Sequence, residues 1–404
     1  MKLDWWLTGI CSSRFFSGLV VMTYAAALPI LQKEWVMSAA AAGSIASAYN
    51  IGFAISLVIF SALADRTGPK PIYIWSMFAG ALFSLGFALF ARDYLSALIL
   101  YTLVAISLGG TYTTGLMILA DHYPVQRRGL AMGFFIASTS LSYALSLALS
   151  GIALPIGGYK LSFLLTCLGP VAGSILGWIT LAKTRVTTVK RKAGRGFRKE
   201  VIGNRPAMLL IGGYTFHNWE LLGMWAWTPA FLFGCLAGGE TEGLRIAGLG
   251  AYITASFHFT GLFASFSMGA LSDRLGRARV MLILTGTSAL CSLLFGWSIG
   301  WSLILVIIIG LIYSFSALGD SPILSAALSE AVEYPYLGAA YGIRSLFGFG
   351  AGAISPLIFG VILDWTNPTT SANIDYKIWG WAYSMLGLGG LGAFWAASRF
   401  RKMS

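Results

Sequence analysis

The sequence predicts an all-α membrane protein with twelve transmembrane helices, arranged as two pseudo-symmetric six-helix bundles. Three observations support this fold class: a composition too apolar for a water-soluble surface, a series of apolar stretches of membrane-spanning length, and a charged turn that occurs once in each half of the chain. We expect an N-terminal bundle at residues 1–182, a basic cytosolic linker at 183–205 and a C-terminal bundle at 206–404.

The composition excludes an ordinary soluble domain. Hydrophobic residues make up 57% of the chain and charged residues only 10%, whereas a soluble domain carries about 25% charged residues. A net charge of +12 would suggest nucleic acid in a soluble protein. Here the basic residues gather in short loops on one predicted side, so no nucleic-acid partner is expected. The four cysteines lie in or beside apolar stretches without a CxxC pair, and no metal or cofactor is expected.

The apolar stretches are long enough to cross a bilayer, which takes about 20 residues per helix. They lie near residues 5–30, 40–64, 72–91, 94–120, 130–153, 160–182, 206–235, 246–271, 280–299, 302–330, 338–363 and 378–398. Most lysines and arginines between them fall on the side that holds both termini. Because cytosolic loops are enriched in these residues, both termini are predicted to be cytosolic, in a bacterial inner membrane whose lipids surround the protein.

A charged turn is the clearest internal repeat. Residues 61–70, S-A-L-A-D-R-T-G-P-K, reappear as residues 269–279, G-A-L-S-D-R-L-G-R-A-R, each between the second and third stretch of its half. A Tyr-Pro pair at 123–124 and again at 334–335 precedes the fifth stretch of each half. Corresponding features in both halves indicate two bundles related by pseudo-symmetry.

The repeated turn resembles the hallmark turn of the major facilitator superfamily, G-x-x-x-D-R/K-x-G-R/K-R/K, with Ser61 in place of the first glycine. The resemblance covers the whole chain and implies a monomer that works by alternating access. It also implies that the two turns close the cytosolic gate, where the aspartate of the turn acts through the positive end of a neighbouring helix and nearby charges. Arg66 can pair with Asp65 there. The alternative is that these charges only fix topology. The predicted gating residues are Asp65, Arg66, Lys70, Asp273, Arg274, Arg277, Glu330 and Glu333.

Two further segments bear on the branch of the family. Proton-driven antiporters of this superfamily often carry an arginine in their fourth span, and the stretch 94–120 has none, which argues against proton/drug antiport. Residues 216–227 are similar to the seventh span of the cyanate-permease-like branch. The second resemblance implies an organic-anion branch of the family.

Ionisable side chains inside the predicted spans indicate function, because each costs about 2.5–3.5 kcal/mol to insert at membrane depth. The chain has Arg14, His217, Glu220, His258, Asp320 and Arg344 at such positions. His258 stands alone and is expected to be a packing histidine. Helical spacing places the others on shared polar faces, and the predicted substrate-binding residues are Arg14, Ser17, Tyr24, His217, Glu220, Tyr313, Asp320 and Arg344.

Arg14 is the predicted substrate ligand, because a guanidinium offers a planar fork of donors that fits a carboxylate. The alternative is an ion pair between Arg14 and Glu220. Glu220 is also a candidate carrier of a coupling proton. His217 is the other candidate carrier, with a neutral core histidine as its alternative. Asp320 and Arg344 lie at similar depth on consecutive spans, and a salt bridge between them is predicted.

Catalytic motifs such as GxSxG, HExxH and the P-loop are missing from the sequence, so neither an enzyme nor an ATP-driven pump is expected. We therefore predict a secondary active transporter that moves a small carboxylate-like anion by alternating access, with a proton as the candidate coupling ion. Two alternatives stay open. One is an exporter of amphipathic or hydrophobic compounds with a pocket of Trp and Met side chains, and the other is a sensor that kept the fold without moving solute.

Overall fold

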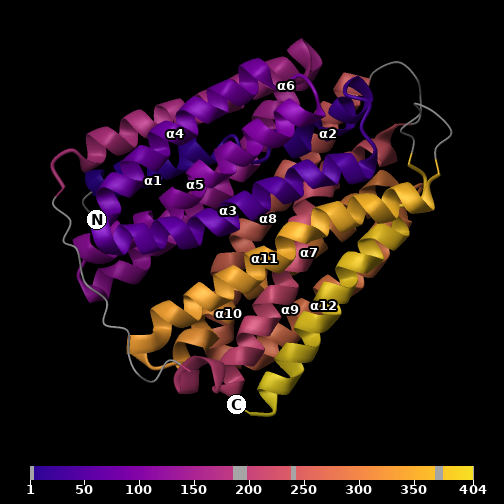
Figure 1. The fold of residues 1–404 in the computed structure, drawn as a ribbon. Coiled ribbons are helices and arrows are strands. Elements are labelled where there is room, and N and C mark those ends of the chain that lie inside the picture. The colour runs from indigo at the N-terminus through magenta and orange to yellow at the C-terminus, as the bar shows by residue number, and fades with distance from the viewer. Residues whose placement is uncertain (1–3, 185–197, 238–242, 369–375, 404) are drawn as a thin grey trace. The chain divides into compact units, whose positions relative to one another are not determined.

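The structure, a computed structural model, describes residues 4–184, 198–237, 243–368 and 376–403, and these residues are helical apart from short turns (Figure 1). No strand occurs within these ranges. The helices are α1 Trp5–Gly18, α2 Thr23–Glu34, α3 Ala39–Thr67, α4 Pro69–Phe90, α5 Tyr94–His122, α6 Val125–Leu181, η1 Arg198–Ile202, α7 Arg205–Leu236, α8 Gly243–Leu275, α9 Arg277–Phe295, η2 Gly296–Ser298, α10 Leu303–Ala331, α11 Tyr334–Thr366 and α12 Gly380–Arg401.

Each predicted apolar stretch is mostly helical, which confirms the all-α membrane fold. Nine helical segments of the described chain are long and apolar enough to cross a membrane. The count differs from twelve partly because two predicted stretches, 130–153 and 160–182, lie in the single element α6.

The α6 element is a helical hairpin. Gly157 and Gly158 interrupt it with non-helical backbone angles, and Gly158 has a φ of 63°. Along α1, Arg14 meets Thr139 and Gly18 meets Ser142, so the first arm runs parallel to α1. In the second arm, Gly177 lies against Ser13 and Gly169 lies against Phe16, so this arm runs antiparallel to α1. The two arms therefore occupy the two predicted spans.

The first predicted span, 5–30, lies within the candidate membrane span Trp5–Glu34, although residues 19–22 form turns between α1 and α2. The Tyr101 hydroxyl donates to the Val21 carbonyl at 2.5 Å, which satisfies a backbone acceptor that the break leaves free. Gly18 ends α1 where a Cβ would lie 2.1 Å from the Ser142 hydroxyl oxygen. Tertiary packing therefore supports the break.

The two repeated turns share one backbone conformation. Gly68 precedes α4 with φ 91° and ψ 149°, and Gly276 precedes α9 with φ 91° and ψ 137°. Only glycine adopts this region without strain. The identical φ and similar ψ angles of the two glycines show that the sequence repeat is also a structural repeat.

Substituting alanine at Gly276 tests this requirement. Nothing lies within 4 Å of a Cβ at this position, so the expected loss of about 1–3 kcal/mol in stability comes from the backbone alone. Gly269→Ala is the matched control, because Gly269 is helical and a Cβ there also meets no atom within 4 Å. Thermal unfolding should show a lower melting temperature for Gly276→Ala and an unchanged or higher one for Gly269→Ala. Equal melting temperatures would contradict this account.

The described chain forms two compact units. Unit 1 contains residues 4–31, 48–184 and 243–255, and unit 2 contains residues 32–47, 198–237, 256–368 and 376–403. The segments 32–47 and 243–255 thus each belong to the unit built mainly from the other half of the sequence. The predicted linker, 183–205, lies mostly outside the described residues and stays a prediction.

Each unit has its own apolar core. In unit 1, Ile10, Tyr73 and Phe135 are fully buried where α1, α4 and the first arm of α6 meet. In unit 2, Leu210 and Leu328 belong to a core cluster that joins α7 to α10. These cores hold the helices that carry the buried polar residues described below.

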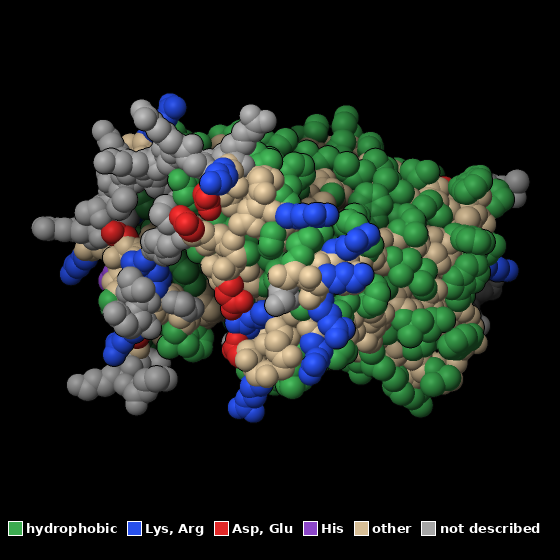
Figure 2. Space-filling view, turned by 90° about the horizontal axis from the view of Figure 1, so that it is seen from below, with side chains coloured by type: hydrophobic (Ala, Val, Ile, Leu, Met, Phe, Trp, Pro, Cys, Tyr) green, Lys and Arg blue, Asp and Glu red, His purple; other side chains and the backbone are tan. Residues whose placement is uncertain are grey.

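Large hydrophobic side chains also cover much of the surface. On the face in Figure 2, hydrophobic side chains cover a broad area, and most of the lysines and arginines lie outside it. Trp5, Trp75 and Phe263 are 76%, 73% and 70% exposed. Exposed apolar area on this scale is typical of a surface that faces lipid.

Candidate functional site: buried polar clusters in each unit

Arg14 is the buried cation of unit 1. Its side chain on α1 is 4% exposed. The Nη1 group donates to the Thr111 hydroxyl of α5 at 2.7 Å, and Nε donates to the Thr139 hydroxyl of α6 at 3.0 Å. The rings of Tyr112 and Phe135 lie 5.4 and 5.7 Å from the guanidinium carbon.

The hydroxyls that hold Arg14 are neutral. Thr111 donates its own hydroxyl to the Leu108 carbonyl at 2.6 Å and so presents a lone pair to the arginine. Over the part of unit 1 that the structure describes, no carboxylate forms an ion pair with Arg14. Its positive charge is therefore oriented but not neutralised there. An ion pair with Glu220 stays a prediction, because the two residues belong to different units.

The other predicted residues of this face lie apart from the guanidinium. The Ser17 hydroxyl donates to the Ser13 carbonyl at 2.8 Å and contacts the Met77 sulfur at 3.3 Å. Tyr24 follows the break after α1 and packs 5.5 Å from the Tyr101 ring. Arg14 and Ser17 lie three residues apart on α1, whereas Tyr24 lies on α2 after the turns, so the predicted face of these three residues does not rest on one continuous helix. Their role in substrate binding stays a prediction.

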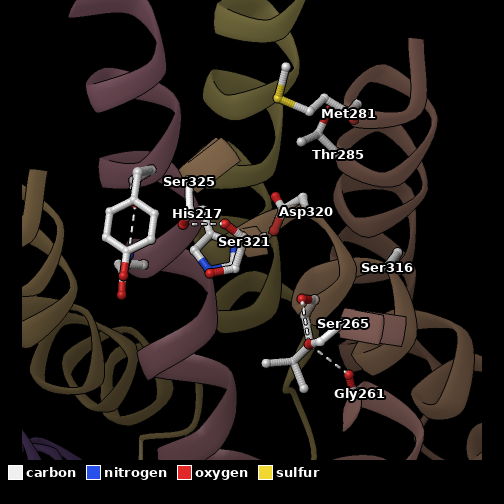
Figure 3. A network of polar contacts seen from close by, with 12 residues as sticks. His217, Gly261, Ser265, Met281, Thr285, Ser316, Asp320, Ser321 and Ser325 are labelled. Carbon is white, nitrogen blue, oxygen red and sulfur yellow. Dashed lines mark hydrogen bonds and ion pairs between the residues drawn. The ribbon is translucent and has the colours of Figure 1, made fainter. Parts of the chain in front are cut away.

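His217 and Asp320 form the buried pair of unit 2, as Figure 3 shows. Nδ1 of His217 on α7 lies 2.8 Å from Oδ1 of Asp320 on α10, and both side chains are 3% exposed. Oδ1 has no hydrogen bond of good geometry among the described residues. The pair is therefore a close, buried contact between an imidazole nitrogen and a carboxylate oxygen.

The predicted salt bridge between Asp320 and Arg344 is wrong. Arg344 on α11 lies over the Tyr214 ring at 4.0 Å, and its Nη1 donates to the Ser325 hydroxyl at 2.5 Å. Tyr214 stacks in turn on His217, with ring centroids 5.6 Å apart. The tyrosine thus lies between the arginine and the acid–histidine pair, and Arg344 keeps a buried Nε without a hydrogen-bond partner among the described residues.

Glu220 lies one turn after His217 on α7 and is 3% exposed. The side chains of Ser288, Ser292 and Tyr313 surround its carboxyl group. Tyr313 donates to Ser292 at 2.9 Å, while Oε1 of Glu220 has no hydrogen-bond partner within the described ranges.

His258 fits the expectation of a packing histidine. It is 4% exposed on α8, and its ring lies 5.4 Å from that of Trp225. No group of three or more His, Cys, Asp or Glu side chains that could hold a metal ion occurs in the described part of the chain.

The repeated turns differ in their charge contacts. In unit 2, Arg277 lies 2.5 Å from Asp273 and 2.9 Å from Glu330 of α10. Burial is low for both acids, and hydrogen bonding to Glu330 raises the pKa of Arg277. Arg274 and Glu333 are exposed.

In unit 1, Lys70 donates to the carbonyls of Ala182 and Thr184 at 3.2 and 3.0 Å. The expected pairing of Arg66 with Asp65 is wrong, since no ion pair joins these two described residues. Adjacent residues on α3 point in different directions, which keeps their charged groups apart.

Sequence reasoning missed Thr111, Thr139 and Tyr214, which hold or cover the buried charges. Threonine and tyrosine are uncharged and fit apolar spans, so they give no local signal of a site. A search for hydroxyl groups on the spans facing Arg14 could have proposed the two threonines.

Comparison with known proteins identifies the family. A family model described as Major Facilitator Superfamily matches residues 10–244, more than half of the chain. A protein of Cupriavidus necator named as a probable sulfoacetate transporter, SauU, is 25% identical over 95% of this chain and 91% of its own length. The 4-hydroxybenzoate transporter PcaK of Pseudomonas aeruginosa is 24% identical over 86% of this chain and 83% of its own.

Other matches cover less of a relative or concern the fold alone. A gallate transporter of Pseudomonas putida is 29% identical over 44% of this chain, which is 39% of that transporter's length. The crystal structure of a mutant of the nucleoside transporter NupG has a TM-score of 0.77 at 13% identity, covering 98% of this chain and 99% of that one. A bacterial homolog of the human lysosomal transporter Spinster has a TM-score of 0.73 at 16% identity, covering 100% and 98%. The fold, the family model and the relatives agree that this chain is a membrane-embedded transporter, not an enzyme, and that it belongs to the major facilitator superfamily.

Proposed function

We propose that the chain is a secondary active transporter for a small organic anion with a carboxylate or similarly flat anionic group. The observation that carries this proposal is Arg14, which is buried, oriented by two neutral hydroxyls and without a carboxylate partner in its unit. A planar guanidinium in such surroundings favours a bidentate anion, because hydrogen bonds between charged groups are stronger than those between neutral ones. The substrate supplies the charge that neutralises Arg14.

The relatives support this substrate class. Gallate, 4-hydroxybenzoate and sulfoacetate, in the names of three of them, are all carboxylate anions. The rings of Tyr112 and Phe135 beside Arg14 suit a flat substrate. Relatives that transport solute also favour transport over a sensor without transport.

The coupling ion in this proposal is a proton. Among the residues that the structure describes, none donates a hydrogen bond to Oε1 of Glu220, and His217 lies 2.8 Å from Asp320. Each of these groups changes the net charge of unit 2 by one when it gains or loses a proton. Proton binding at either place therefore supplies the charge change that couples anion movement to a proton gradient.

Alternating access and orientation complete the proposal. Both termini face the cytosol of a bacterial inner membrane, the protein works as a monomer, and the two repeated turns lie at the cytosolic gate. The contacts of Arg277 with Asp273 and Glu330 support a gating role for the second turn. Because both acids are more than half exposed, these ion pairs suit a gate that opens at little cost in stability.

A thermal-shift panel on the purified protein tests the substrate class. Gallate, 4-hydroxybenzoate and sulfoacetate are compared with neutral nicotinamide. A ligand that binds only the folded protein stabilises it by about 2.7 kcal/mol at one hundred times its dissociation constant. We expect at least one carboxylate to raise the melting temperature. A rise with neutral amphipathic compounds and with none of the anions would favour the exporter instead.

A further inference from the structure

We propose that Asp364 is a positioning residue of the transport cycle, whose carboxylate holds the start of α3 against the end of α11 in one of the two access states. This inference rests on the proposed alternating-access function and its topology. In that topology the α2–α3 and α11–α12 connections lie on the extracytoplasmic side.

The carboxylate makes two direct backbone contacts. The amide nitrogen of Ala39 donates to Oδ1 of Asp364 at 2.8 Å, and that of Ala40 donates to Oδ2 at 2.8 Å. These are the first two residues of α3, whose N–H groups have no partner within the helix. The negative charge also lies at the positive end of the helix dipole.

A local cap covers only part of this helix end. The Ser38 hydroxyl accepts from the Ala41 amide at 3.1 Å, next to the two amides that Asp364 takes. The start of α3 is therefore fully hydrogen-bonded only while α11 lies beside it. Released from α11, the Ala39 and Ala40 amides need water instead.

The helices approach closely at the same place. A Cβ on Gly360 of α11 would lie 2.2 Å from the carbonyl oxygen of Ala39. A Cβ on Gly43 of α3 would likewise lie 2.2 Å from the carbonyl oxygen of Pro356. The Leu357 amide donates to the Ser47 hydroxyl at 3.0 Å. Since position 39 pairs with 360 and position 43 with 356, the two helices run antiparallel.

A third segment joins the Asp364 contact. The Tyr376 hydroxyl lies 3.4 Å from Oδ1 of Asp364, and the Gln32 side-chain amide donates to that hydroxyl at 3.1 Å. No lysine or arginine of the described chain forms an ion pair with Asp364. The charge is thus held by N–H and O–H donors that water can replace, as a reversible contact requires.

The arrangement of α3 makes this contact relevant to transport. Residues 39–47 belong to unit 2, whereas residues 48–67 of the same helix belong to unit 1. The start of α8 also belongs to unit 1, where Gly248 packs against Gly151. At the start of α3, Asp364 adds two carboxylate contacts to backbone amides to the close packing of the helices.

Cysteine labelling measures the docking directly. Ser47→Cys places a thiol of similar size at a position that is 3% exposed. Membrane vesicles carrying it receive a membrane-impermeant maleimide from the extracytoplasmic side, with and without Asp364→Asn or Asp364→Ala. The parent chain with its native cysteines supplies the background rate. We expect about tenfold faster labelling in both Asp364 variants, the shift that follows from losing a hydrogen bond to a charged group.

Asp93→Asn is the matched control. Asp93 also caps a helix start, but it accepts from Ser96 of its own helix α5 at 2.8 Å. Its replacement should leave the Ser47→Cys labelling rate unchanged. Asp364→Asn keeps one acceptor oxygen and carries the test if Asp364→Ala does not fold.

An unchanged labelling rate in folded Asp364→Asn overturns the proposal, as does an equal increase in Asp93→Asn. Labelling needs no substrate, so a failure of the anion proposal would appear separately, in the thermal-shift panel. Once a transported anion is known, Asp364→Asn should alter kcat for uptake more than the dissociation constant of the anion. If Asp364 had a purely structural role, Asp364→Asn would lower the yield of folded protein but would not change kcat more than the dissociation constant.

Discussion

Replacing Arg14 with glutamine should abolish binding and uptake of the anionic substrate. The guanidinium is oriented by Thr111 and Thr139 and offers a charged, planar fork of donors. Losing two hydrogen bonds between charged groups should weaken binding by about 3–6 kcal/mol, or more than a hundredfold. Arg14→Lys keeps the charge but presents it as a point, so intermediate binding is expected. Ligand-induced shifts in melting temperature and uptake into proteoliposomes measure both effects.

Removing the charge of Arg14 should also stabilise the ligand-free protein, because a residue kept for function can lower stability. An unpaired buried cation is unfavourable, so Arg14→Met should raise the melting temperature of the ligand-free protein while binding is lost. Arg92→Gln, at an exposed loop arginine, is the control and should change neither quantity. Wild-type binding in Arg14→Gln, or a lower melting temperature in Arg14→Met, would contradict the role proposed for Arg14.

Asp320→Asn should be strongly destabilising. Asp320 and His217 are each 3% exposed and lie 2.8 Å apart, and leaving one member of a buried polar pair without its partner costs about 1–3 kcal/mol, or more where the group is charged. A double variant, Asp320→Asn with His217→Gln, should be less destabilised than the sum of the single variants, with a coupling of about 0.5–3 kcal/mol. Thermal unfolding of the four proteins measures the cycle.

Asp273→Asn is the control for this cycle. Its partner Arg277 is also within ion-pair distance, but the Asp273 side chain is 60% exposed, and exposed pairs contribute only about 0–1 kcal/mol. Additive effects in the Asp320–His217 cycle, or equal losses from Asp320→Asn and Asp273→Asn, would show that the two buried groups are not coupled.

The fold could be predicted closely from the sequence because the bilayer imposes simple rules. Apolar length determined where helices lie, and the glycines at 157–158 and 276 mark turns that the structure contains. The break after Gly18 was not predictable, because residues 19–22 are Leu, Val, Val and Met and contain no helix-breaking residue. That break depends on Tyr101 and Ser142, which are distant in the sequence.

The site was predictable only in part. Burial of Arg14, His217, Glu220 and Asp320 followed from charged groups in apolar spans, and the structure confirms that burial. The partners of these residues could not be predicted in the same way. Similar depth on consecutive spans suggested that Asp320 pairs with Arg344, whereas in the structure Asp320 contacts His217. Pairing depends on how helices rotate about their axes, and side-chain spacing along one helix does not determine that rotation.

Counterflow in proteoliposomes tests the central claim most directly. Vesicles with purified protein are loaded with an unlabelled carboxylate identified by the thermal-shift panel, then diluted into a trace of the labelled anion. The account predicts transient accumulation of label that is absent in protein-free vesicles and in Arg14→Gln vesicles. Accumulation by Arg14→Gln at the wild-type rate, or none by the wild-type protein with a carboxylate that it binds, would contradict it.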